Sequence, residues 1–256
     1  MAYGTNGWRS LLVVALLTAC PSGDEPSLGG DSTSTSSDDS QATGGAEETA
    51  FGMGDDLPLA TDIPEIKQGQ IPSGKRVELR AVVLSSPEGQ IDQARSYFVR
   101  DPAHDSFAGL RVAAPPVFET PSGEFPLDLV GTAVFDDRRE GWTLSLEQLF
   151  ESRDPAPSIE PIVTELTVIA PGGSQREALA DMLVRLDDPE GKTLWISAQL
   201  GNGFELSEQL VVDLEPFGVR LDPPPVDTSL ASVTGLVLLE GDRTVLLPRS
   251  DDDLRF

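Results

Sequence analysis

Short segments in which polar and apolar residues alternate recur along the chain from residue 75 onward. Alternation with a period of two is typical of half-buried β-strands, and the Gly, Pro and Asp residues between such segments mark turns. The clearest segment reads KRVELRAVVLS over residues 75–85. The same reasoning predicts strands at 96–100, 109–113, 129–135, 142–146, 183–186, 193–200, 204–206, 210–214, 230–239 and 244–247. The pattern therefore predicts an all-β fold of the sandwich or small-barrel type.

Residues 151–160 (ESRDPAPSIE) interrupt this pattern, and we interpret them as a linker. They divide the body into a first β domain at 61–150 and a second at 161–256. One short helix is expected near 174–182, because Ser174 and Glu177 have the spacing of a capping box and an apolar run follows them. The glycine-flanked Asn202 predicts a hairpin turn between two strands of the second domain.

One strand pattern with an internal glycine occurs twice. DLVGTAVF at 128–135 is followed by a charged turn and WTLSL, and ASVTGLVLL at 231–239 is followed by EGDR and TVLL. Gly131 and Gly235 lie inside the first strand of each copy, where glycine often marks a bulge or the corner of a barrel. The repeat predicts two β units in tandem.

The sequence segments VELRAVV, SYFVRD, GLRV and LVGTAV resemble an OB fold, the five-stranded Greek-key barrel. They are similar to OB modules appended to exported bacterial nucleases and phosphoesterases. A second set of segments, MLVRL at 182–186, VTGLV at 233–237 and LPRSDDD at 247–253, fits the second unit. The resemblance spans about residues 65–256 and implies two tandem OB-like barrels. In such proteins the chemistry lies in a separate catalytic domain, and we recognise none in these residues.

The N-terminus has the pattern of an export signal. Arg9 precedes the apolar run LLVVALL, which is too short to span a bilayer, and small residues follow it. The residues Leu17, Thr18, Ala19 and Cys20 resemble the lipobox of bacterial lipoproteins. That resemblance implies a signal peptide at 1–19 and a lipid anchor on Cys20, the only cysteine of the chain. An ordinary secretory signal with an incidental cysteine is the alternative.

Residues 20–60 are predicted to be a disordered acidic tether. They contain nine acidic residues and no Lys or Arg, and as a coil they span on the order of 35 Å. The other 34 acidic residues of the chain exceed 17 basic ones, so the body is also acidic and should be repelled by nucleic acid. Pro21, where Asp would favour inner-membrane retention, favours the outer membrane; the periplasmic or outward orientation stays open.

The sequence offers no catalytic, cofactor or metal residues that we can assign. His104, the only histidine, lies in the loop DPAHD, and a zinc site needs more nitrogen or sulfur ligands than this. The carboxylate pair at 187–188 and the run at 251–253 could bind Ca²⁺, but their adjacent spacing does not fit a calcium loop. We interpret the run at 251–253 as a solvated acidic tail.

The expected function is a non-enzymatic, lipid-anchored binding or scaffold module of the bacterial cell envelope, with a protein or glycan partner. One alternative is an accessory subunit of an exported hydrolase. A second is an OB protein that binds single-stranded nucleic acid, which needs a basic groove and stacking aromatic residues. The residues available for that are Tyr97, Phe98, Phe107, Trp142, Arg95, Arg100 and Arg111.

Overall fold

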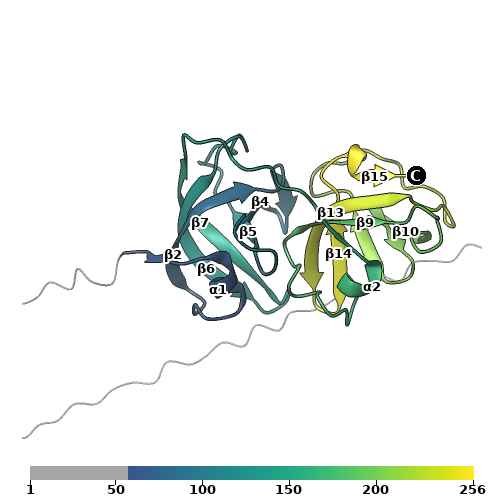
Figure 1. The fold of residues 1–256 in the computed structure, drawn as a ribbon, viewed down its shortest axis with the longest axis horizontal. Helices are drawn as coiled ribbons and strands as arrows, with labels where there is room; N and C mark the ends of the chain where they lie inside the picture. Colours follow the sequence, from purple (N-terminus) through teal and green to yellow (C-terminus); the bar gives the residue numbers. More distant parts are fainter. Residues whose placement is uncertain (1–56) are drawn as a thin grey trace, which may run out of the picture. The chain divides into compact units, whose positions relative to one another are not determined.

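The computed structural model describes residues 57–256. The predicted signal peptide, the lipobox with Cys20 and the tether up to residue 56 lie outside the described residues. The described part is all-β, as predicted, and its strands form two sheets (Figure 1). None of its helices is long and apolar enough to cross a membrane.

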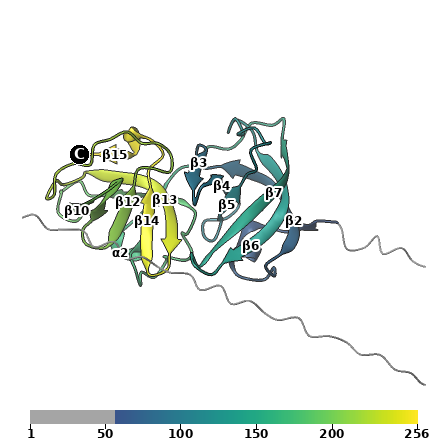
Figure 2. The ribbon, with the colours of Figure 1, turned by 180° about the vertical axis from the view of Figure 1, so that it is seen from behind.

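The first unit comprises one helix and seven strands. These are β1 (Leu59–Ala60), α1 (Ile63–Lys67), β2 (Lys75–Leu84), β3 (Gly89–Ile91), β4 (Ala94–Arg100), β5 (Gly109–Ala113), β6 (Leu127–Asp136) and β7 (Gly141–Glu151). Strand β2 pairs with both β6 and β4, so the strands β2, β4, β5, β7 and β6 close into a five-stranded barrel (Figures 1 and 2). Only β5 and β7 run parallel within it, which is the connectivity of an OB fold.

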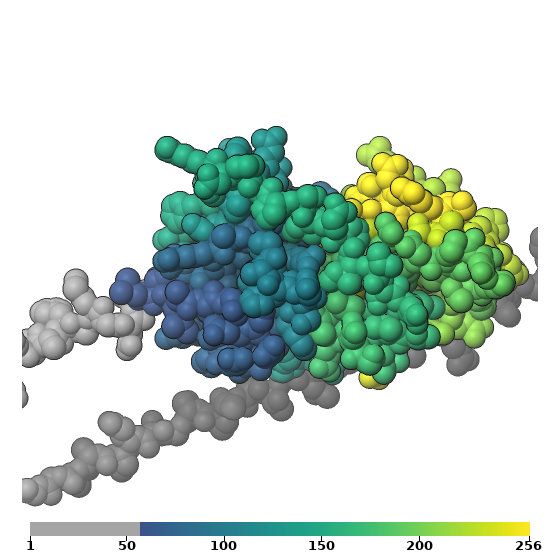
Figure 3. All heavy atoms as spheres, in the orientation of Figure 1, coloured from purple at the N-terminus to yellow at the C-terminus, as the bar shows by residue number. Residues whose placement is uncertain are grey.

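Apolar side chains fill the inside of this barrel. Strands β2, β4, β5, β6 and β7 each contribute fully buried residues to one cluster, and α1 closes it with Ile63 and Ile66. On the face drawn in Figure 3 the atoms of this unit are closely packed. The first unit is therefore a packed core rather than a channel.

The second unit repeats this order of elements. It comprises β8 (Ile162–Thr164), α2 (Leu166–Ile169), β9 (Leu183–Asp187), β10 (Ile196–Leu200), β11 (Gly203–Leu206), β12 (Leu210–Asp213), β13 (Ser232–Glu240), β14 (Arg243–Leu247), the 3-10 turn η1 (Asp251–Asp253) and β15 (Leu254–Arg255). Strands β12 and β14 run parallel, as β5 and β7 do. Each unit also begins with a short strand that pairs in parallel with the next long one.

The two units match residue by residue at their entry. Thr61-Asp62-Ile63 precedes the buried Ile66 in the first unit, and Thr164-Glu165-Leu166 precedes the buried Ile169 in the second. The predicted repeat itself is present as the antiparallel pairs β6–β7 and β13–β14. Its glycines have a common cause, because a Cβ on Gly131 would lie 2.3 Å from the Ser145 carbonyl oxygen, and one on Gly235 would lie 2.8 Å from Leu246 Cγ.

The second sheet closes differently from the first. Strand β9 ends at Asp187 and pairs with neither β10 nor β11. Its counterpart in the first unit, β2, does pair with β4. Instead, Trp195 forms a bridge with Ser229, in the segment that leads into β13. The strand that would seal the barrel is therefore interrupted by the turn at 188–193.

Three details of the sequence-based prediction are wrong. Residues 174–181 form successive turns rather than a helix, and the helix of the second unit is α2, eight residues earlier. Helix α1 was not expected; Asp62 caps it by accepting a hydrogen bond from the Glu65 N–H (2.9 Å). Strand β1 lies inside the segment assigned to the tether and pairs with β2.

An apolar cluster joins the two units. Ile91 and Phe98 of the first unit pack with Leu183, Leu236, Leu238, Val245 and Leu247 of the second. The outer face of β4 is thereby buried within the chain. Gly109 at the start of β5 permits the close approach, because a Cβ there would lie 2.3 Å from the Asp181 carbonyl oxygen.

Candidate functional site

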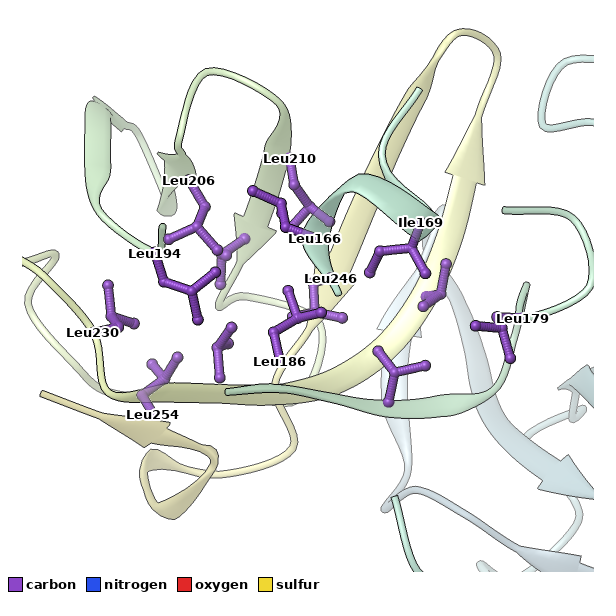
Figure 4. Packing of buried hydrophobic residues seen from close by; sticks show 14 of the residues in the cluster. Leu166, Ile169, Leu179, Leu186, Leu194, Leu206, Leu210, Leu230, Leu246 and Leu254 are labelled. Atoms are coloured by element: carbon purple, nitrogen blue, oxygen red, sulfur yellow. The ribbon is translucent and has the colours of Figure 1, made fainter. Parts of the chain in front are cut away.

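A groove of about 680 Å³ opens on the second unit where its barrel is not sealed. This volume is in the range of small-molecule sites in proteins, about 300–1,000 Å³. Its floor is apolar and consists of Leu166, Leu186 and Leu194, which point toward one interior from α2, β9 and the segment before β10 (Figure 4). Its rim is formed by Thr164, Glu165, Thr167, Asp187, Thr193, Trp195, Ser207 and Gln209. We call this site the Trp195 groove.

The buried Asp188 holds the turn that presents Trp195. Its carboxylate accepts hydrogen bonds from the backbone N–H groups of Thr193 (2.5 Å) and Leu194 (2.8 Å). Burial alone would raise the pKa of Asp188, but these backbone hydrogen bonds outweigh it and lower the pKa below its ordinary value. The backbone of Trp195 is held in turn by Ser207, whose N–H donates to the Trp195 carbonyl (2.8 Å).

Several polar groups of the rim have no partner among the described residues. They are the indole N–H of Trp195, the side-chain amide of Gln209, the hydroxyls of Thr164 and Thr167, and the carboxylate of Glu165. Around the apolar floor they place a hydrogen-bond donor (the indole), an acceptor (the carboxylate), and hydroxyl and amide groups that both donate and accept. This arrangement suits a ligand that is apolar on its faces and polar around its edge.

The first unit has a longer connection at the corresponding point of the chain. The connection from β4 to β5 covers residues 101–108, whereas the connection from β11 to β12 is the tight turn 207–209. The longer connection brings Nε2 of His104 to 3.7 Å from Oδ2 of Asp62, the counterpart of Glu165. Arg100 fixes this loop by donating to the His104 carbonyl oxygen (3.3 Å). The two units thus differ in the length of this connection and in what lies beside the residue before the helix.

His104 is a half-exposed loop residue, with 43% of its side chain accessible. Its Nε2 also lies 3.8 Å from Oδ2 of Asp101. Within residues 57–256, no three His, Cys, Asp or Glu side chains converge as metal ligands.

The acidic run at 251–253 forms the turn η1, in which Asp251 and Asp252 are exposed, as predicted for a solvated run. The prediction is wrong for Asp253, which is buried. The Asp253 carboxylate accepts from the side chain of Arg249 through Nε and Nη2, both at 3.1 Å. Asp187 is exposed and paired with Arg185 (3.0 Å). These carboxylates serve local structure.

Four of the residues considered for nucleic-acid binding, Tyr97, Phe98, Arg95 and Arg111, already make contacts within the chain. Tyr97 lies inside the first barrel, where burial raises the pKa of its hydroxyl, and Phe98 packs edge-on against Phe217 (6.3 Å between centroids). Arg95 is paired with Glu88 and Arg111 with Asp92. The outer side of β4 is thus committed to contacts within the chain.

No protein-family model matches the chain. No curated protein matches it either.

The sequence analysis did not single out the residues of the Trp195 groove. One signal was available, since the Thr-acidic-aliphatic triplet before each helix repeats at 61–63 and 164–166. The groove itself depends on the length of a connecting turn and on where β9 ends. Neither can be read from periodicity.

Proposed function

We propose that this chain is a lipid-anchored, non-enzymatic binding module of the bacterial cell envelope, and that the Trp195 groove is its ligand site. The observation that carries the proposal is the open groove with its uncommitted polar rim. The first unit offers an internal comparison, because its longer connection places His104 3.7 Å from Asp62, the counterpart of Glu165.

We further propose that the ligand is uncharged and rich in hydroxyl groups, as envelope glycans are. A sugar ring has apolar C–H faces and a hydroxyl edge, which matches leucine side chains surrounded by Thr, Gln and Trp. Each hydroxyl can donate and accept a hydrogen bond, so it can bind either the oxygen or the NH2 group of the Gln209 side chain. The lining residues include no Lys or Arg, while Glu165 and Asp187 would repel anions.

The anchor is tested by metabolic labelling. The full-length chain, expressed in a bacterium that processes lipoproteins, should incorporate labelled palmitate, and its mature N-terminus should begin at Cys20. The Cys20→Ala variant should lose both the label and membrane retention. A labelled Cys20→Ala protein, or an unlabelled wild type, would contradict the anchor.

The ligand site is tested with Trp195→Ala. Purified full-length protein should bind an array of neutral oligosaccharides saturably, and recovered sugars should be chemically unchanged. Trp195→Ala should weaken binding about tenfold or more. The matched control is Phe150→Ala, which removes an aromatic ring that is 58% exposed on β7 outside the groove. Equal binding by both variants would overturn the site, and selective binding of peptides would overturn the glycan class.

A further inference from the structure

A second cavity, of about 500 Å³, lies beside the hairpin between β6 and β7 of the first unit. Three aromatic residues line it: Phe107, Phe135 and Trp142. The rings of Phe135 and Trp142 lie 5.3 Å apart at 60°, and Phe135 is 37% exposed, so part of its ring faces the opening. We call this site the Trp142 pocket.

Carboxylates surround the aromatic walls. Asp137, Glu140 and Glu177 line the pocket, and none of the three side chains has an ionic partner among the described residues. The one cation that lines it, Lys67, is already paired with the buried Asp181. The pocket therefore combines π faces with unbalanced negative charge.

This combination selects one kind of ligand. The face of an aromatic ring attracts cations, and the attraction is used to recognise quaternary ammonium groups. A methylated ammonium carries its charge beneath an apolar shell, so it can contact rings while the carboxylates stay solvated at the rim. A primary ammonium is strongly hydrated and has more to lose on entry. Anions and neutral apolar groups gain nothing from the rim.

The backbone holds the pocket in a specific shape. Phe107 (φ +55°) and Glu140 (φ +50°) both adopt left-handed conformations, which are uncommon for residues other than glycine. The Phe107 N–H donates to the Ala178 carbonyl oxygen (2.7 Å), which fixes Phe107 to the segment that carries the lining residues Glu177 and Ala180. The walls are thus placed before any ligand arrives.

We propose that the Trp142 pocket binds a small quaternary ammonium ion. This site is distinct from the Trp195 groove and does not depend on it. Each site has its own tryptophan, the only two within residues 57–256, so fluorescence can report on them separately.

The experiment titrates the full-length protein with three probes of similar skeleton: choline, ethanolamine and 3,3-dimethylbutan-1-ol. The last is the uncharged isostere of choline. Choline should change the fluorescence of a Trp195→Phe variant saturably, with a Kd of about 1 mM or tighter. Ethanolamine should bind more weakly, and the neutral isostere more weakly still. The response should be absent from a Trp142→Phe variant, whose only tryptophan within residues 57–256 is Trp195.

Two variants test the walls and the rim. Phe135→Leu and Glu140→Gln should each weaken choline binding about fivefold, with urea midpoints near that of the wild type. The matched control, Glu190→Gln, removes a carboxylate that is paired with Lys192 on the surface, and choline binding should not change. Equal affinity for choline and its neutral isostere, or no saturable response to choline, would overturn the proposal.

Discussion

The Nζ atom of Lys67 lies 2.5 Å from Oδ2 of Asp181, and this ion pair joins the first unit to the second. Both side chains are almost fully buried, at 5% and 6% exposed. Lys67 ends helix α1, and Asp181 lies two residues before β9 in a left-handed conformation (φ +63°). The pair therefore ties the entry helix of the first unit to the segment that leads into β9 of the second.

Removing one partner of this pair should be costly. Lys67→Met leaves the Asp181 carboxylate buried and unpaired, and losses of about 3–5 kcal/mol are typical when a buried pair is broken in this way. Urea unfolding of the full-length protein measures the loss. Lys192→Met, which removes an exposed ion pair with Glu190, should cost no more than about 1 kcal/mol. Similar losses for the two variants would show that the buried pair is not a principal tie between the units.

The repeated glycines should tolerate no side chain. Gly131→Ala and Gly235→Ala force a methyl group against the neighbouring strand, so each should lower the free energy of unfolding by about 1–3 kcal/mol. Gly201→Ala is the matched control, since a Cβ there meets nothing within 4 Å. Its stability should be unchanged or slightly higher. Thermal unfolding of the three variants distinguishes these outcomes.

Glu88 should make the first unit sensitive to acid. Hydrogen bonds from Arg95, and one from Thr120, lower the pKa of Glu88 from 4.5 to about 2. A lowered pKa stabilises the fold above the unfolded-state pKa, and that stabilisation is lost as the pH falls from about 4.5 toward 2. Glu88→Gln should therefore be less stable than the wild type at neutral pH, with the difference shrinking over this window. A constant difference from pH 7 to pH 2, measured by urea unfolding, would contradict the assignment.

Asp188 should be needed for the Trp195 groove, because it holds the turn that precedes Trp195. Asp188→Ala leaves the N–H groups of Thr193 and Leu194 without their acceptor, which should cost about 1–3 kcal/mol. Asp188→Asn keeps an acceptor oxygen and should cost less. The same order is expected for loss of oligosaccharide binding at the groove. Undiminished binding by Asp188→Ala would show that the turn does not need this support.

Strands such as β7 and β12 could be predicted because buried and more exposed residues alternate along them. Residues 109–113 form β5 as predicted, although its first four residues are all buried, and the hairpin turn at Asn202 connects β10 and β11. The helix did not follow its local signal. Ser174 and Glu177 have capping-box spacing, but the segment at 174–181 runs as turns, and Asp181 N–H donates to the Val237 carbonyl in the neighbouring β13 (2.6 Å). Tertiary contacts thus overrode local propensity.

The two candidate sites could not be predicted for a related reason. The Trp195 groove exists because β9 stops at Asp187 and the 207–209 turn is short. The Trp142 pocket joins residues as far apart in sequence as Phe107 and Glu177. Periodicity describes which face of a strand is buried, but it does not describe where two strands fail to meet.

The short strand β1 has a mechanical consequence. The described chain enters the first unit through Leu59–Ala60, which pairs in parallel with the start of β2 by only two residues. If Cys20 holds the protein to a membrane, any pulling force along the chain loads this contact first. Two residues of pairing can peel away while the barrel, closed by β2 with β4 and β6, stays intact. Strand β1 would then detach first under load and lengthen the segment between the membrane and the first unit, while the two β units stay folded.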